Sequence, residues 1–312
     1  MAKGCLQCRE RSWFLLGLAA IAAMLDGTCS AADAIEYPLS IAVDRSGVIF
    51  LADRNLPGVW RLEGDRLGLF FRGSKKFRTP LNAVRCVALD REGSLLAGDS
   101  ATTEVYRFDE KGNPQPLTAQ GKPYGQIGIP MGIAVDAEGS LLVSDLETNR
   151  IVKVPKEGGK VQPFAAVPAP RGLFYDSRRQ LWVISGRSLV VVSEAGVTTK
   201  VVDDGVFLFP HTVVVGEDGT AYVCDGYAKA VWKIPPGQKP EKWVRGGPLE
   251  NPVGMDLRQG KLFVVDSHAK AVFEIDAART LVAYSTEIEP PELADAFHTA
   301  IEEAVQNLPK YL

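Results

Sequence analysis

Residues 130–145 of the 312-residue chain read PMGIAVDAEGSLLVSD. A Pro, a variable residue and a small residue lead into an apolar run, a turn follows around Gly139, and a second apolar run ends in Asp145. Two short aliphatic runs separated by a Gly-containing turn predict a β-hairpin with antiparallel strands.

The same pattern occurs six times between residues 37 and 285. The variable residue after the Pro position marks each copy, and these residues are Leu39, Arg85, Met131, Arg171, His211 and Val253. Their spacings are 46, 46, 40, 40 and 42 residues, which indicates a structural repeat. In the third copy, four β-rich runs cover residues 132–136, 141–145, 150–154 and 161–165, as in a four-stranded antiparallel meander.

Six such meanders bury their faces when they pack around a common axis. We therefore predict an all-β fold over residues 32–285, a six-bladed β-propeller of four-stranded antiparallel blades. A solenoid of stacked meanders is the alternative. The pattern does not decide how the ring closes.

Acidic residues end the second strand in five of the six copies. They are Asp53, Asp99, Asp145, Asp225 and Asp266. A short carboxylate at a strand end accepts hydrogen bonds from the backbone of the next loop, so a structural role is expected. A ring of carboxylates that binds a metal or a ligand is the alternative. The fourth copy has Ser185 instead, followed by a shorter loop that should lower the wall beside Arg171.

The motifs Pro-x-Gly, aliphatic-Ala-aliphatic-Asp, Val-x-Asp and Asn149-Arg150-Ile151 resemble the NHL repeat, and the resemblance covers residues 37–285. It implies a six-bladed propeller. Propellers with NHL-like repeats serve as binding platforms, sensor domains and enzymes, so the resemblance alone does not assign a function.

The two ends of the chain differ from the repeats. Residues 1–31 combine a basic start, an apolar run from Trp13 to Leu25 and small residues at 29–31, which predicts a cleaved signal peptide and an exported, periplasmic or extracellular protein. A membrane anchor is the alternative, but the apolar run is shorter than a spanning helix needs, so no membrane span is expected after cleavage. Residues 286–312 carry an apolar stripe at a spacing near four, which predicts a short amphipathic C-terminal helix.

Charge and cysteine content restrict the partners. With 35 basic and 38 acidic residues the formal net charge is −3, which disfavours nucleic acid as a partner.

Two cysteines, Cys86 and Cys224, remain after removal of the leader. They fall in blades 2 and 5, on opposite sides of a six-bladed ring. They are therefore expected to be buried free thiols rather than a disulfide.

The first strand of each blade is expected to lie nearest the axis, so the six variable residues should surround one mouth of the central channel. Arg85, Arg171 and His211 are the polar members, and Tyr227 and His268 are expected on neighbouring loop tips. Two arginines at a partly dry mouth favour a carboxylate, phosphate or sulfate. The alternative is that each arginine forms an ion pair with a strand-end Asp.

Two propeller enzyme families are similar at a few of these positions. Peptidyl-hydroxyglycine amidating lyases resemble the chain at His211 and Tyr227, but they use three zinc-binding histidines and the other five positions here lack one. The gluconolactonase and senescence-marker family is similar around Pro170–Val183, but its members have a metal-binding Asp where this chain has Arg171. No metal site and no cofactor are therefore predicted.

These observations predict a non-catalytic ligand-binding or protein-interaction module. Its partner would be a protein or a small acidic or carbohydrate ligand at the channel mouth. The alternative is a hydrolase or lyase, of the lactonase or amidating-lyase type, with its active site at the same mouth. The sequence does not predict an oligomeric state.

Overall fold

The computed structural model describes residues 35–119, 121–122 and 124–284. The predicted leader and the predicted C-terminal helix lie outside the described residues and stay predictions. Every element of the described residues is a strand, and the strands form six four-stranded antiparallel sheets.

Each sheet is built from four consecutive strands. Blade 1 contains β1 (Pro38–Val43), β2 (Ile49–Asp53), β3 (Gly58–Glu63) and β4 (Arg66–Arg72). Blade 2 contains β5 (Val84–Leu89), β6 (Leu95–Asp99), β7 (Glu104–Phe108) and β8 (Pro114–Pro116). Blade 3 contains β9 (Pro130–Val135), β10 (Leu141–Asp145), β11 (Arg150–Val154) and β12 (Gln162–Ala166). Blade 4 contains β13 (Pro170–Tyr175), β14 (Leu181–Ser185), β15 (Ser188–Val192) and β16 (Thr198–Val202). Blade 5 contains β17 (Pro210–Val215), β18 (Ala221–Asp225), β19 (Ala230–Ile234) and β20 (Glu241–Arg245). Blade 6 contains β21 (Pro252–Arg258), β22 (Lys261–Asp266), β23 (Ala271–Ile275) and β24 (Leu281–Ala283).

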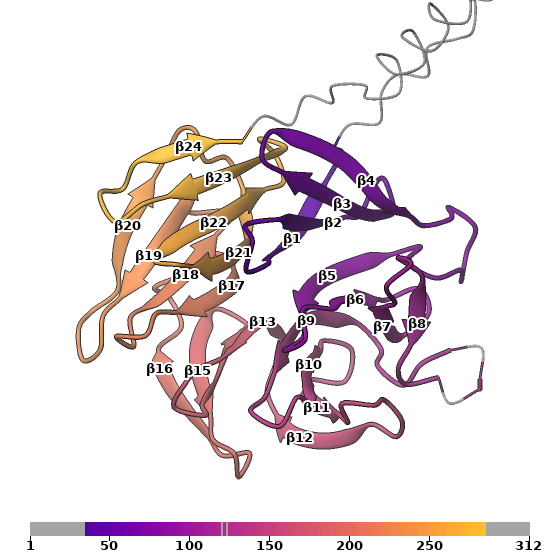
Figure 1. The fold of residues 1–312 in the computed structure, drawn as a ribbon. Coiled ribbons are helices and arrows are strands. Elements are labelled where there is room, and N and C mark those ends of the chain that lie inside the picture. Colours follow the sequence, from indigo (N-terminus) through magenta and orange to yellow (C-terminus); the bar gives the residue numbers. More distant parts are fainter. Residues whose placement is uncertain (1–34, 120, 123, 285–312) are drawn as a thin grey trace, which may run out of the picture. The chain divides into compact units, whose positions relative to one another are not determined.

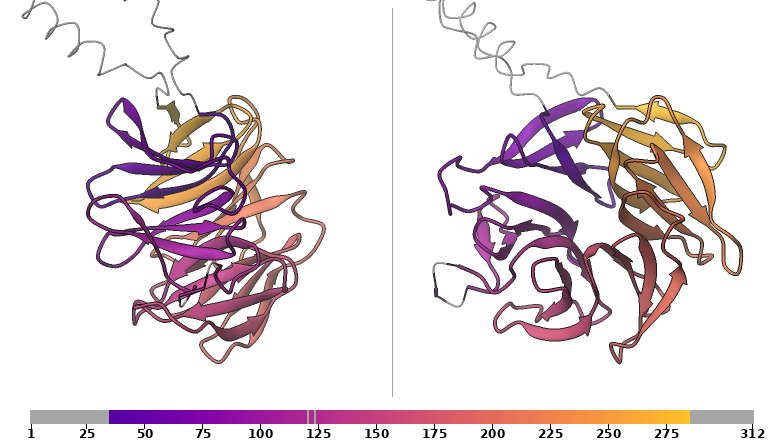
Figure 2. Two further views of the ribbon diagram at one scale, coloured as in Figure 1. Left: turned by 90° about the vertical axis from the view of Figure 1, so that its right-hand side faces the viewer. Right: turned by 180° about the vertical axis from the view of Figure 1, so that it is seen from behind.

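The six sheets follow one another around a central axis, with the first strand of each sheet nearest the axis (Figures 1 and 2). The predicted six-bladed propeller is confirmed, and the solenoid alternative is wrong. In blade 3 the first strand begins two residues before the predicted run, at Pro130, and the fourth strand begins at Gln162. The ends of a strand are the part that a periodic pattern defines least, so shifts of one or two residues are expected.

The small residue of the repeat is explained by the close approach of the innermost strands. A Cβ atom on Gly172 would lie 2.6 Å from the backbone oxygen of His211 in the next blade. A Cβ atom on Gly254 would lie 2.9 Å from the Cα atom of Ser40 in blade 1. Both positions therefore exclude a side chain, and the innermost strands approach each other closely enough to enclose a narrow channel.

The core consists of six apolar clusters, and each cluster joins two adjacent blades. One of them packs Ile41, Leu51 and Trp60 of blade 1 against Phe263 and Val265 of blade 6. The ring is therefore closed by packing between the first and last blades, and among the described strands none is exchanged between them.

Two hydrogen bonds reinforce this closure. The Val43 N–H of β1 donates to Asp256 Oδ2 of β21 at 2.7 Å, and Arg258 Nε donates to the Val43 carbonyl at 2.7 Å. Asp256 takes a position that holds Ala, Phe or Val in the other blades. The last blade thus carries a polar pair that meets the first blade.

Cys86 of β5 and Cys224 of β18 are buried and free, as predicted. They lie in blades 2 and 5, and burial raises the pKa of each thiol to about 12. Both thiols are protonated and unreactive in the folded protein at neutral pH.

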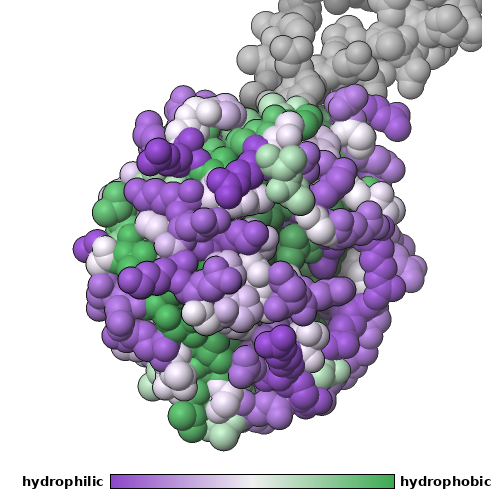
Figure 3. Space-filling model, turned by 90° about the vertical axis from the view of Figure 1, so that its left-hand side faces the viewer, coloured by the Kyte–Doolittle hydropathy of each residue, from purple (hydrophilic) through white to green (hydrophobic). Residues whose placement is uncertain are grey.

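The side of the ring seen in Figure 3 is covered mostly by hydrophilic side chains, with hydrophobic ones in narrow strips between them. Among the residues that the structure describes, there is no helix with the length and apolar character needed to cross a membrane.

Candidate functional site

The strand-end aspartates are structural, as expected from the sequence. All five are fully buried. Asp53 accepts hydrogen bonds from the N–H groups of Glu36 and Tyr37 at 2.7 and 3.0 Å and from Trp60 Nε1 at 3.2 Å. The carboxylates are thus occupied by the protein's own donors. Within the described ranges, no group of three or more His, Cys, Asp or Glu side chains is placed to hold a metal ion.

A cavity of about 210 Å³ lies at the mouth of the channel, where the first strands begin and the second strands end. It is lined by Tyr37, Leu39, Arg54, Arg85, Met131, Arg171, His211, Thr212 and Val253. All six variable residues of the repeat are in this set, so their predicted position around the mouth is confirmed. Among the described residues, the lining contains three arginines and no carboxylate.

Arg85 and Arg171 are half-buried, and neither forms an ion pair within the described part of the chain. Arg85 Nε donates to Ser100 Oγ at 3.0 Å. Arg171 Nε is buried without a hydrogen-bond partner in the described residues. The alternative in which both arginines pair with strand-end aspartates is therefore wrong, because backbone N–H groups already occupy those carboxylates.

Burial lowers the pKa of both guanidinium groups from its ordinary value, and the positive charge of Arg54 lowers that of Arg85 further. The direction of these shifts shows that desolvation outweighs the available negative charge. Both side chains nevertheless stay protonated at neutral pH. The mouth is therefore a partly desolvated positive site.

His211 is neutral in this environment. Burial, followed by the positive charge of Arg171, lowers its pKa to about 4, and Asp225 opposes the shift. Its ring meets the Phe209 ring edge-on, with 4.8 Å between centroids. A Cβ atom on Gly226 would lie 3.4 Å from His211 Nε2 and 2.1 Å from Asn251 Oδ1. Because Gly226 has no side chain, the space beside Nε2 of the imidazole stays open.

Tyr227 and His268 do not line the cavity, in contrast to the other three predicted site residues. Tyr227 is 70% exposed and stacks on Phe209, with 4.7 Å between ring centroids and an angle of 19°. His268 is exposed and its ring lies 6.3 Å from that of Tyr37. Both residues lie in the loops after the second strands, and each packs against an aromatic ring beside the mouth, Phe209 for Tyr227 and Tyr37 for His268.

The sequence did not reveal Arg54, Tyr37 and Phe209 as part of the site. Arg54 directly follows the strand-end Asp53, so its place in the repeat puts it at the same edge as the variable residues. Tyr37 and Phe209 directly precede the Pro residues that open β1 and β17. Positions on both sides of the repeat motif therefore contribute to the mouth.

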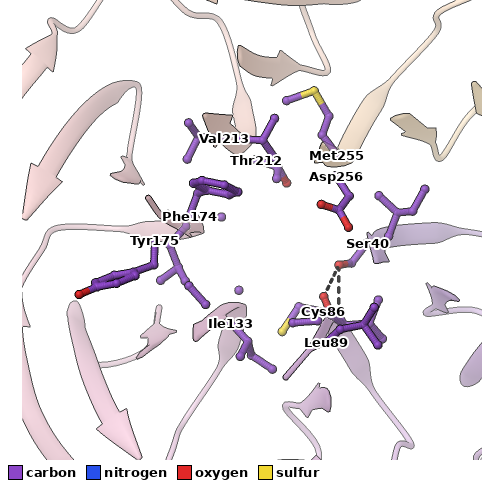
Figure 4. A pocket seen from close by; sticks show the side chains of 18 of the residues that line it. Ser40, Cys86, Leu89, Ile133, Phe174, Tyr175, Thr212, Val213, Met255 and Asp256 are labelled. Atoms are coloured by element: carbon purple, nitrogen blue, oxygen red, sulfur yellow. Dashed lines mark hydrogen bonds between the residues drawn. The ribbon is translucent and has the colours of Figure 1, made fainter. Parts of the chain in front are cut away.

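A second cavity, of about 260 Å³, lies further along the channel, and Met131 and Thr212 line both cavities. Figure 4 shows the carboxylate of Asp256 and the hydroxyl of Ser40 directed toward its centre. Burial raises the pKa of Asp256, although Arg258 and two backbone N–H groups act in the opposite direction. This part of the channel thus contains a carboxylate, whereas the described residues that line the mouth include none.

The fold and the site together define a six-bladed β-propeller with a positive channel mouth. No family model and no curated protein matches the chain. Solved structures do match. Virginiamycin B lyase from Staphylococcus aureus is 16% identical with a TM-score of 0.62, covering 81% of this chain and 85% of the lyase. The gluconolactonase XC5397 from Xanthomonas campestris is 13% identical with a TM-score of 0.64, covering 80% of this chain and 87% of that chain.

A structure of a nidogen/laminin complex also matches, with 17% identity, a TM-score of 0.61 and coverage of 73% of this chain and 89% of that chain. The matched structures therefore include a lyase, a lactonase and a protein complex. Identities this low establish a shared fold and leave the function to be argued from the site.

Proposed function

We propose that this protein is a binding module that holds an anionic group of its ligand at the channel mouth. The observation that supports this proposal is the convergence of Arg54, Arg85 and Arg171 on one cavity that no carboxylate of the described part of the chain lines. Positive side chains that are partly desolvated and lack an ion-pair partner gain the most from an external anion.

The size of the cavity limits what enters it. Pockets that enclose a whole drug-sized ligand have volumes of roughly 300–1,000 Å³, and this one has about 210 Å³. It therefore suits a carboxylate, phosphate or sulfate group with the atoms next to it. The rest of the ligand, either a protein or a small carbohydrate, would lie outside the mouth.

The predicted signal peptide and the NHL-like repeat belong to the same proposal. Together they describe an exported NHL-type propeller that meets its ligand outside the cytoplasm. The nidogen/laminin match supports a binding role for a propeller of this shape.

Isothermal titration calorimetry with sulfate, phosphate and acetate tests the proposal. The R85A/R171A double variant should bind the best of these anions at least about a hundredfold more weakly, because each charge-assisted contact contributes roughly 1.5–3 kcal/mol. The R66A/R245A variant is a matched control, since it removes two exposed arginines on β4 and β20. Equal affinities in the two variants, or no binding by the unmodified protein, would contradict the proposal.

A hydrolase or lyase is the second candidate, and the neutral imidazole of His211 is the observation that favours it. A histidine that is unprotonated at neutral pH can accept a proton from a substrate held by the arginines. A histidine-to-alanine variant of the matched S. aureus lyase is described as catalytically inactive. The test is whether the protein turns over quinupristin or gluconolactone. Activity that is lost in H211A and kept in R66A/R245A would support this candidate. If the unmodified protein turns over neither compound, these two reactions are excluded.

A further inference from the structure

An aromatic platform, defined here as Phe209 and Tyr227, lies beside the arginine cavity. The guanidinium carbon of Arg171 lies 4.2 Å from the centre of the Phe209 ring. Tyr227 stacks on the same ring. The platform is therefore in direct contact with one of the arginines that line the mouth.

The outer part of this platform is open to solvent. The Tyr227 side chain is 70% exposed although it stacks on Phe209, so much of its ring surface contacts no protein atoms. Leu208, which precedes Phe209, is also 48% exposed. Asp225 holds this loop in place by accepting hydrogen bonds from the N–H groups of Leu208 and Phe209, both at 2.8 Å. A fixed loop thus presents an apolar surface next to a positive site.

The loop beside Arg171 is short, as the sequence predicts. Two residues, Gly186 and Arg187, separate β14 from β15, whereas four residues separate the corresponding strands of the other blades. Arg187 Nε donates to the Phe207 carbonyl at 3.0 Å, which ties this short turn to the loop before the platform. A ligand with its anionic end in the cavity can therefore extend over the rim on this side.

We propose that the ligand is an acidic saccharide whose carboxylate lies among the arginines while a sugar ring lies on Tyr227. This inference rests on the proposed function. A pyranose ring has an apolar C–H face that suits an exposed aromatic ring. The neutral imidazole of His211 both donates and accepts hydrogen bonds, which suits a hydroxylated ring better than a purely aromatic acid.

Calorimetry with sodium glucuronate, compared with acetate, glucose and benzoate, tests the inference. We expect glucuronate to bind more tightly than the other three. Y227L keeps an apolar side chain of similar size but removes the flat ring, and it should weaken glucuronate binding about three- to tenfold while acetate binding is unchanged. Y227F should bind glucuronate like the unmodified protein.

F77L is the matched control. Phe77 is 74% exposed and also contacts an arginine, with Arg78 Cζ 5.2 Å from its ring centre, but it lies on the loop between blades 1 and 2. F77L should leave glucuronate binding unchanged. A weakening equal to that of Y227L would overturn the role of the platform.

The variants separate failure of this inference from failure of the proposed function. If Y227L binds glucuronate normally while R85A/R171A does not, the aromatic platform does not bind the sugar ring, and the proposed anion site is still supported. If benzoate or acetate binds as tightly as glucuronate, the proposal that the ligand is a saccharide is wrong. If R85A/R171A binds every probe normally, the anion site itself is wrong.

Discussion

Two sets of charged residues lie at the same end of the propeller channel and differ in what surrounds them. The strand-end aspartates are fully buried, and each accepts hydrogen bonds from the protein itself. The mouth arginines, defined as Arg54, Arg85 and Arg171, line an open cavity and form no ion pair among the described residues.

This difference distinguishes charges that hold the fold from charges that are available to a ligand. Both sets occupy fixed positions of the repeat and lie at the same edge of the blades, so position alone does not separate them. A buried carboxylate whose oxygens accept hydrogen bonds from protein donors increases the free energy of unfolding. Arg85 and Arg171 have no ion-pair partner among the described residues and burial lowers the pKa of both, so they cost stability and are available to bind a ligand.

The largest effect is expected on the aspartate side of this comparison. D53A leaves the N–H groups of Glu36, Tyr37 and Leu56 without their acceptor, and should lower the free energy of unfolding by at least about 3 kcal/mol. Denaturant unfolding measures the change. D203A is the control, because the Asp203 side chain is 85% exposed and its removal should change stability by less than about 0.5 kcal/mol. Similar small losses in both variants would remove the structural role of the aspartates.

A smaller effect is expected from His211, which lies between the two sets. Its pKa falls from 6.5 to about 4 on folding, so the unfolded chain binds more protons between these values. The contribution of His211 to stability is therefore complete above pH 6.5 and decreases as the pH falls toward 4, by up to about 3 kcal/mol.

The difference in unfolding free energy between the unmodified protein and H211N, measured at pH 7 and pH 5, isolates this contribution from that of the carboxyl groups. The unmodified protein should lose more stability than H211N on this change of pH. A difference that does not depend on pH would show that the imidazole is not held neutral. Because a bound anion favours the protonated imidazole, NMR titration should also show a higher His211 pKa when sulfate is present.

Much of this architecture is predictable from the repeat. The spacing of Leu39, Arg85, Met131, Arg171, His211 and Val253 is enough to place all six around the channel mouth, because strand edges follow from the period. The carboxylate at the end of each second strand likewise predicts its hydrogen bonds to the following loop. Such features depend on backbone position, which a repeated pattern specifies directly.

Features that depend on side-chain direction across blades were not predictable in the same way. Tyr227 and His268 follow the second strands on four-residue loops, and these loops hold both side chains at the rim instead of in the cavity. The stack of Arg171 on Phe209 joins blade 4 to the segment before blade 5, which no local pattern records. The pattern did not decide how the ring closes, because contacts such as that of Val43 with Asp256 join the first and last blades over more than 200 residues of sequence.

The thermal stability of R85A/R171A, with and without sodium glucuronate, tests most directly whether the mouth arginines serve a ligand. We expect the double variant to melt at the same temperature as the unmodified protein or slightly higher, because two partly desolvated charges without ion-pair partners are removed. Glucuronate should raise the melting temperature of the unmodified protein and not that of the variant, because only a ligand that binds the folded state stabilises it. A variant that melts several degrees lower yet still responds to glucuronate like the unmodified protein would contradict this assignment.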